Sequence, residues 1–205
     1  AIEAARAKEE AVFVWLNAAL GSAASPYLCY DGQGYFDSDH PAPTDADGAV
    51  QSNKPSGGAL AIATLWAGIR AMQSFEDDTG RCMGLKPDLL LTEPWGEQVA
   101  RELIPPVYGG ISAQVSVMAN MGIDVAISPQ LSSAASAANA NWYLFCTKGP
   151  VKPIILQERT PVEFGSLQSE SDSGFMRDVY LFGTRARWAV GAGPWFLAYG
   201  NAGAG

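Results

Sequence analysis

The chain has a single histidine, His40, and three cysteines among its 205 residues. One histidine cannot supply a multi-histidine metal site, and no HExxH motif is present. Cys29, Cys82 and Cys146 are widely separated and form no CxxC pair. The sequence therefore indicates neither a disulfide framework nor a zinc knuckle, and a reducing compartment is expected.

Positive charge is also scarce. Thirteen Lys and Arg stand against 21 Asp and Glu, which gives a net charge of −8, and no Lys/Arg-rich run is present. Proteins that bind nucleic acid directly neutralise its phosphates with clustered cations, so we expect no such binding here. No apolar run approaches the roughly 18 residues of a membrane span. The apolar run at residues 11–25 follows more acidic than basic residues, unlike a secretory signal, so a soluble, non-secreted protein is expected.

What the sequence does contain is a dense group of polar residues in the stretch YDGQGYFDSDHP, residues 30–41. Asp31, Asp37, Asp39 and His40 fall within ten positions there. Such groups can bind a divalent cation, and a histidine beside a carboxylate can act as a general base. The spacing does not match an EF-hand, however. We interpret the stretch as a structural loop of turns, and keep a metal-dependent hydrolase built on it as a third hypothesis.

Other catalytic patterns are missing as well. The sequence has no GxSxG elbow, no phosphate-binding loop and no GxGxxG after a strand. No cysteine has the histidine near it in sequence. We therefore predict that the protein is not an enzyme and has no catalytic, cofactor-binding or metal-binding residues.

Periodicity and turn signals predict an α+β chain. A long excursion rich in Gly, Pro, Ser, Asp and Asn, residues 22–58, follows the first helix. Predicted helices cover residues 2–20, 59–75 and 95–104, and predicted strands cover residues 87–94, 122–129, 142–146 and 152–159.

The last third of the chain predicts a C-terminal hairpin. Apolar residues alternate with polar or small residues along the predicted strand at residues 180–190. This alternation should bury Trp188 on a covered face and leave Arg185 and Arg187 in solvent or at a subunit boundary. GAGP at residues 191–194 should then turn the chain into an aromatic strand, WFLAY, at residues 195–199.

Several short sequence motifs, taken in their order along the chain, resemble those of the major head subunit of Mu-like phages and prophages, the gpT family. They are YDGQGYFDSDHP, FEDDTGRCMGLKPDLLL, ISPQL, WYLF, VKPIILQER with PVEF, and ARWAVGAGPWFLAYG, and they span about residues 28–200. The pairing of DGQ and FDSDHP with KPIILQER is the most specific part. The resemblance implies the tailed-phage capsid fold of the Hong Kong 97 type: a spine helix on a long antiparallel sheet, joined to a mixed sheet flanked by helices.

On this resemblance, residues 1–57 and 151–205 correspond to the peripheral domain and residues 58–150 to the axial domain. The N-terminal arm, the extended hairpin loop and the first part of the spine helix would precede residue 1. In that fold these segments reach over neighbouring subunits and supply much of the contact between them. Because this chain lacks them, we expect it to be a folded monomer or small oligomer when it is expressed alone.

The resemblance further implies a virion structural protein that self-associates into pentamers and hexamers of an icosahedral shell. The shell would assemble in the cytoplasm of a host bacterium and enclose double-stranded DNA without binding it specifically. Scaffold, portal and decoration proteins are further partners, and no membrane is involved. An encapsulin-like compartment shell is the alternative from another class.

Overall fold

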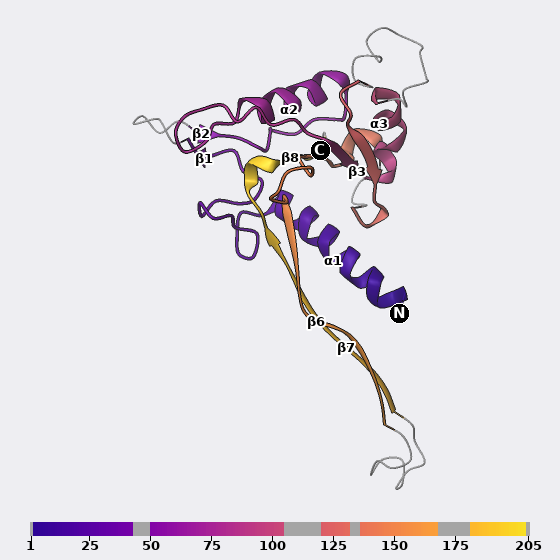
Figure 1. Cartoon of the computed structure of the whole chain (residues 1–205). Coiled ribbons are helices and arrows are strands. Elements are labelled where there is room, and N and C mark those ends of the chain that lie inside the picture. Colours follow the sequence, from indigo (N-terminus) through magenta and orange to yellow (C-terminus); the bar gives the residue numbers. More distant parts are fainter. Residues whose placement is uncertain (1, 43–49, 105–119, 132–135, 168–180, 204–205) are drawn as a thin grey trace.

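The computed structural model describes residues 2–42, 50–104, 120–131, 136–167 and 181–203. It is a mixed α+β structure with a four-stranded sheet, two two-stranded sheets and three α-helices in these ranges. A body carries most of the elements, and a long two-stranded arm leads away from it (Figure 1).

Helix α1 (Ile2–Gly21) is rich in alanine and in charged helix formers, and it ends at a glycine. Its second half buries Trp15, Leu16, Ala19 and Leu20. This spacing places the four side chains on one stripe of the helix, which faces the core.

The four-stranded sheet forms the centre of the body, in the order β4-β3-β5-β8. Strand β3 (Leu89–Thr92) pairs in parallel with β4 (Asp124–Ile127) and antiparallel with β5 (Trp142–Phe145). Strand β8 (Ala198–Asn201) pairs antiparallel with β5. All residues of β5 and β8 are buried, because helices and loops cover both faces of these strands.

Helices pack on the two faces of strand β8. A Cβ added to Gly68 of α2 (Ile62–Ser74) would lie 2.9 Å from the ring of Tyr199, so this helix lies very close to the strand. A Cβ added to the next strand residue, Gly200, would instead meet Phe36 and Leu20. Since successive strand residues face opposite sides, α2 and the end of α1 cover opposite faces. Helix α3 (Glu97–Leu103) follows β3 after a 3₁₀ turn, η1 (Pro94–Gly96).

The arm consists of β6 (Ile154–Leu167) and β7 (Leu181–Ala192), paired antiparallel. The register shifts between Glu158 and Thr160 and again between Thr160 and Glu163, so the strands are bulged around Pro161. Proline cannot donate to a strand ladder and is tolerated at such bulges, which is why β6 continues well beyond the predicted end at residue 159. Lys8 of α1 forms an ion pair with Glu158 of the arm at 2.6 Å.

The predicted helices and core strands are confirmed, but the predicted C-terminal hairpin is wrong. Residues 195–197 form a 3₁₀ turn, η4, rather than the first part of a strand, and β8 begins at Ala198. Strand β7 pairs with β6, and β8 leaves it to pair with β5. Alternation within one segment reports which side of a strand is covered but does not report its partner. The last strand therefore lies in one sheet with β3, β4 and β5.

The alternation predicted for β7 is found in a weaker form. Arg185 and Arg187 are exposed as expected, but Trp188 is half-buried rather than buried. Within the described ranges no second sheet packs over the arm, so the face that carries Trp188 is covered only in part.

Truncating Trp188 should therefore cost less than an ordinary core deletion. Truncation of a fully buried aromatic side chain to alanine costs about 3–5 kcal/mol. We expect Trp188→Ala to lower the free energy of unfolding by about 1–2 kcal/mol, because only part of the Trp188 ring is removed from water when the protein folds. Arg187→Ala should change it by no more than about 0.5 kcal/mol. Urea denaturation of both variants measures this, and equal losses would contradict the observed facing of the strand.

Candidate functional site

The polar stretch at residues 30–41 folds through local turns. The Gln33 N–H donates to Asp31 Oδ1, which closes a turn over Gly32, whose φ of 84° favours glycine. Strand β1 (His40–Pro41) then pairs with β2 (Val50–Gln51). This pairing brings the chain's one histidine over the base of the arm, where the aromatic ring of Trp195 lies.

His40 is fully buried between two polar groups and a ring. Its Nδ1 lies 2.7 Å from Asp31 Oδ2 and its Nε2 lies 3.3 Å from Asn53 Oδ1. The imidazole stacks on Trp195 with centroids 4.1 Å apart and planes 4° apart. Both ring nitrogens thus face oxygen acceptors. The Asp31 carboxylate is the closer of the two, and with Asn53 it fixes the orientation of the ring.

Asn53 connects the pieces of this cluster. Its Nδ2 donates to the carbonyl oxygens of Tyr35 at 2.8 Å and of Trp195 at 3.1 Å. Its Oδ1 accepts from the Asp37 N–H at 2.9 Å as well as facing His40. The two carbonyls fix which end of the amide points where, since only the nitrogen can donate to them. A buried, fully bonded side chain of this kind fixes the fold locally.

The two other carboxylates of the stretch differ. Partial burial works against ionisation of Asp37, but N–H donors from Ser38 and Gly34 outweigh it and hold its pKa below the ordinary value. A hydrogen bond with the carboxylate of Asp37 raises the pKa of Asp39. The structure thus joins Asp31 directly to His40, links Asp37 to them through Asn53, and leaves Asp39 exposed.

The cluster is bonded as a structural unit. The Asp31 and Asp37 carboxylates already accept bonds from His40 or backbone N–H groups. In the part of the chain that the structure describes, no three His, Cys, Asp or Glu side chains are grouped so as to hold a metal ion. Sequence reasoning found the four clustered residues but missed Asn53 and Trp195, which lack any local signal because their contacts cross long stretches of sequence.

Divalent cations should therefore leave the stability of the protein unchanged. A metal bound only by the folded state would raise the melting temperature by mass action. We expect the same midpoint, within about a degree, after chelation and with excess calcium, magnesium or zinc. Differential scanning calorimetry measures this directly. A rise of many degrees with one of these ions would revive the metal-dependent hydrolase.

Two of the three cysteines, Cys29 and Cys146, are placed where their thiols are poor nucleophiles. Burial, with a smaller effect from the Asp88 carboxylate, raises the pKa of Cys146 to about 12, and its thiol donates to the Lys86 carbonyl. Burial also raises the pKa of Cys29, whose thiol donates to the carbonyl of Gly193. Thiols with raised pKa values stay protonated near neutrality and are poor nucleophiles.

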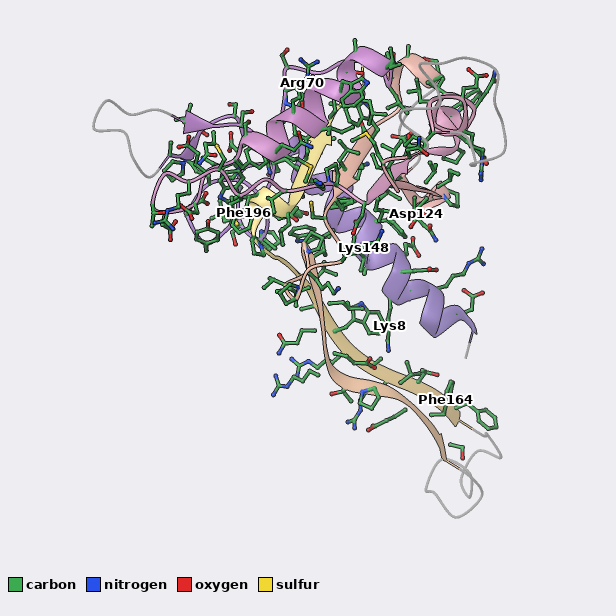
Figure 2. All side chains as sticks on the ribbon, turned by 45° about the horizontal axis from the view of Figure 1, so that its top comes forward. Lys8, Arg70, Asp124, Lys148, Phe164 and Phe196 are labelled. Atoms are coloured by element: carbon green, nitrogen blue, oxygen red, sulfur yellow. The ribbon has the colours of Figure 1, made fainter. Side chains whose placement is uncertain are left out.

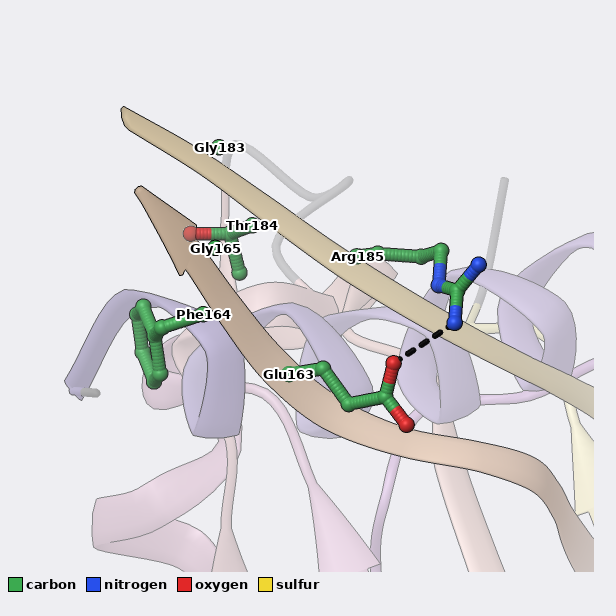
Figure 3. Close-up of a pocket in the computed structure, with 6 residues that line it drawn as sticks. All are labelled: Glu163, Phe164, Gly165, Gly183, Thr184 and Arg185. Atoms are coloured by element: carbon green, nitrogen blue, oxygen red, sulfur yellow. Dashed lines mark hydrogen bonds and ion pairs between the residues drawn. The ribbon is translucent and has the colours of Figure 1, made fainter. Parts of the chain in front are cut away.

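Two open depressions lie on the described surface, one on the arm and one on the body. One lies along the distal arm between Phe164 and Arg185 (Figure 3). The other has a volume of about 340 Å³ and is bordered by the residues after helix α2, by strands β1 and β2, and by the base of the arm. Neither one combines a nucleophile with a histidine or lysine base in its lining. No helix among the described residues is both long and apolar enough to cross a bilayer.

The buried cluster is thus held together by its own hydrogen bonds and by the stacking of His40 on Trp195. The profile of the family described as the Mu-like prophage major head subunit gpT matches residues 1–62 and 116–204, and the chain belongs to this family.

Two longer proteins are similar to the chain. The Mu-like prophage FluMu major head subunit of Haemophilus influenzae is 24% identical over 192 residues, which make up 93% of this chain and 37% of that protein. A chain in the procapsid of bacteriophage JBD30 has 25% identity with a TM-score of 0.42, and the match covers 95% of this chain and 39% of that one. The chain thus spans less than half of the length of both proteins.

Proposed function

We propose that the chain is part of the major capsid subunit of a Mu-like phage or prophage. The subunit self-associates into pentamers and hexamers of an icosahedral shell that encloses double-stranded DNA. Membership of the head subunit family is the observation that carries this proposal. Many identical copies can close a shell through moderate contacts that add up, so the protein needs no catalytic residue, cofactor or metal.

The arrangement of elements is consistent with the Hong Kong 97 type of capsid fold. Helix α1 would be the end of the spine helix, and the arm beside it would belong to the peripheral domain with residues 1–57 and 151–205. Residues 58–150 would form the axial domain that faces the centre of each capsomer. Strand β8, although it lies within residues 151–205, would return to complete the sheet of this domain. Support comes from the mixed sheet with α2 against it and from the ion pair between α1 and the arm.

The net charge of −8 agrees with a wall that confines DNA without gripping it. Assembly would take place in the cytoplasm of the host bacterium, with scaffold, portal and decoration proteins as further partners.

Mass spectrometry of purified heads tests the proposal. Particles are induced from cells that encode the chain and separated by density into DNA-filled and empty heads. We expect peptides from α2 and from the arm to come from the most abundant protein of both fractions. Negative-stain images of the same fractions give the control for intact shells. Intact heads that lack these peptides, or contain them only as a trace, would refute the proposal.

A further inference from the structure

The arm presents apolar surface that the rest of the subunit leaves uncovered. Four of the exposed large hydrophobic residues lie on it: Ile155, Leu156, Phe164 and Phe182. Phe164 pairs with Thr184 and Phe182 with Ser166, so the two aromatic rings stand diagonally on one face. They are 66% and 81% exposed, and Figure 2 shows Phe164 standing out near the far end of the arm. A two-stranded hairpin is only marginally stable alone in water, so a partner surface is expected here.

Among the described residues, the same arm carries two cations without an ion-pair partner. Glu158 is held by Lys8, and Glu163 by Arg185 at 2.7 Å (Figure 3). Arg159 and Arg187 are exposed, and no carboxylate of the described residues lies within ion-pair distance of either one. Arg187 pairs with Thr160, the residue after Arg159, at the register shift. The two guanidinium groups thus extend from one level of the arm, in a chain whose net charge is negative.

A complementary surface lies on the body of the same chain. This surface is the depression of about 340 Å³ beside strands β1 and β2. It is lined by three acidic residues, Glu76, Asp77 and Asp78. Tyr30, which is 70% exposed, and the partly buried Phe196 border it. The Asp77 carboxylate is taken up by donors from Thr79 and Arg81 in its own turn. Glu76 and Asp78 remain available to a ligand. Carboxylates beside accessible aromatic rings suit a guanidinium on an apolar stem, because the guanidinium can form paired hydrogen bonds with the carboxylates and stack on a ring at the same time.

We propose that Arg159 and Arg187 on the arm of one copy dock into the acidic depression, formed by Tyr30, Glu76, Asp78 and Phe196, of a second copy. The arm leads away from the body that carries the depression (Figure 1), so the occupant comes from another molecule. The contact is heterologous, with different surfaces on its two sides, and such contacts extend into rings or lattices. This inference rests on the proposed self-association and adds the residues that carry one of its contacts.

A charge-swap experiment on the whole chain tests the contact. One variant reverses the arm, Arg159→Glu with Arg187→Glu, and a second reverses the depression, Glu76→Lys with Asp78→Lys. Each variant alone opposes like charges across the contact, so sedimentation velocity at high protein concentration should show association at least tenfold weaker than that of the unmodified chain. In an equimolar mixture each contact between one variant and the other pairs opposite charges again, so association between the two variants should return to near the original strength. Added salt should weaken it, since the contact is ionic.

The control is Arg70→Glu, which reverses an exposed cation on helix α2, outside both surfaces, and should associate as the unmodified chain does. Circular dichroism verifies that every variant is folded. The inference is overturned if the unmodified chain shows no concentration-dependent association, if the single reversals associate normally, or if the mixture stays monomeric. Such a result beside intact heads that contain the chain would refute the contact and leave the capsid function standing.

Discussion

Asn53→Ala is expected to lower the free energy of unfolding by about 3–5 kcal/mol, because the change leaves several buried partners unsatisfied at once. The carbonyls of Tyr35 and Trp195 lose their donor, and the Asp37 N–H and the His40 ring lose their acceptor. Water cannot easily replace the amide, since Asn53 and His40 are both fully buried. Urea denaturation followed by tryptophan fluorescence measures the loss.

The matched control is Asn120→Ala, the same change at an exposed turn position, which should cost no more than about 0.5 kcal/mol. If Asn53→Ala were as mild as this control, the hydrogen bonds around the cluster would not hold the loop to the base of the arm.

The second large effect is expected at the base of the arm, where Gly193→Ala should destabilise the protein by at least about 3 kcal/mol. A Cβ there would collide with the carbonyl oxygen of Lys152 and would lie 2.6 Å from that of Pro153. Both are backbone atoms, so no side chain can rotate away. Gly193 also donates its N–H to the Pro153 carbonyl, and the Tyr35 hydroxyl donates to the same oxygen.

Gly191→Ala provides the comparison for this prediction. Gly191 lies two residues earlier in β7, and a Cβ there would meet no atom within 4 Å. We expect its thermal midpoint to match that of the unmodified chain within a few degrees, whereas Gly193→Ala should melt well below it. Similar midpoints for the two variants would show that the strands can separate at the base of the arm without cost.

Local patterns predicted the elements of the body well because each pattern has a local cause. Apolar spacing in α2 and the short apolar runs of β3, β4 and β5 follow directly from which faces these elements bury. The partner of each strand has no such local cause. The glycine-rich turn at residues 191–194 predicts that β7 pairs with residues 195–199. In the structure β7 pairs with β6 instead.

The candidate site shows the same division. The clustering of Asp31, Asp37, Asp39 and His40 was visible in the sequence, and so was its failure to match a known metal-binding spacing. That Asn53 would supply the acceptor for His40, and that Trp195 would cover the ring, depends on the fold bringing the base of the arm against the loop. Periodicity carries no information on such distant contacts.

The order of strands in the sheet affects how the protein folds during synthesis. Strand β5 is complete long before β8, and the whole of the arm is made between them. Until β8 emerges from the ribosome, one edge of β5 has no strand beside it, and the Trp142–Phe145 segment, which is entirely buried in the finished sheet, offers an apolar edge to other chains. Distant pairings form slowly because a long loop must close first. Nascent chains should therefore be most prone to aggregate after β5 and before β8, while the arm is being translated.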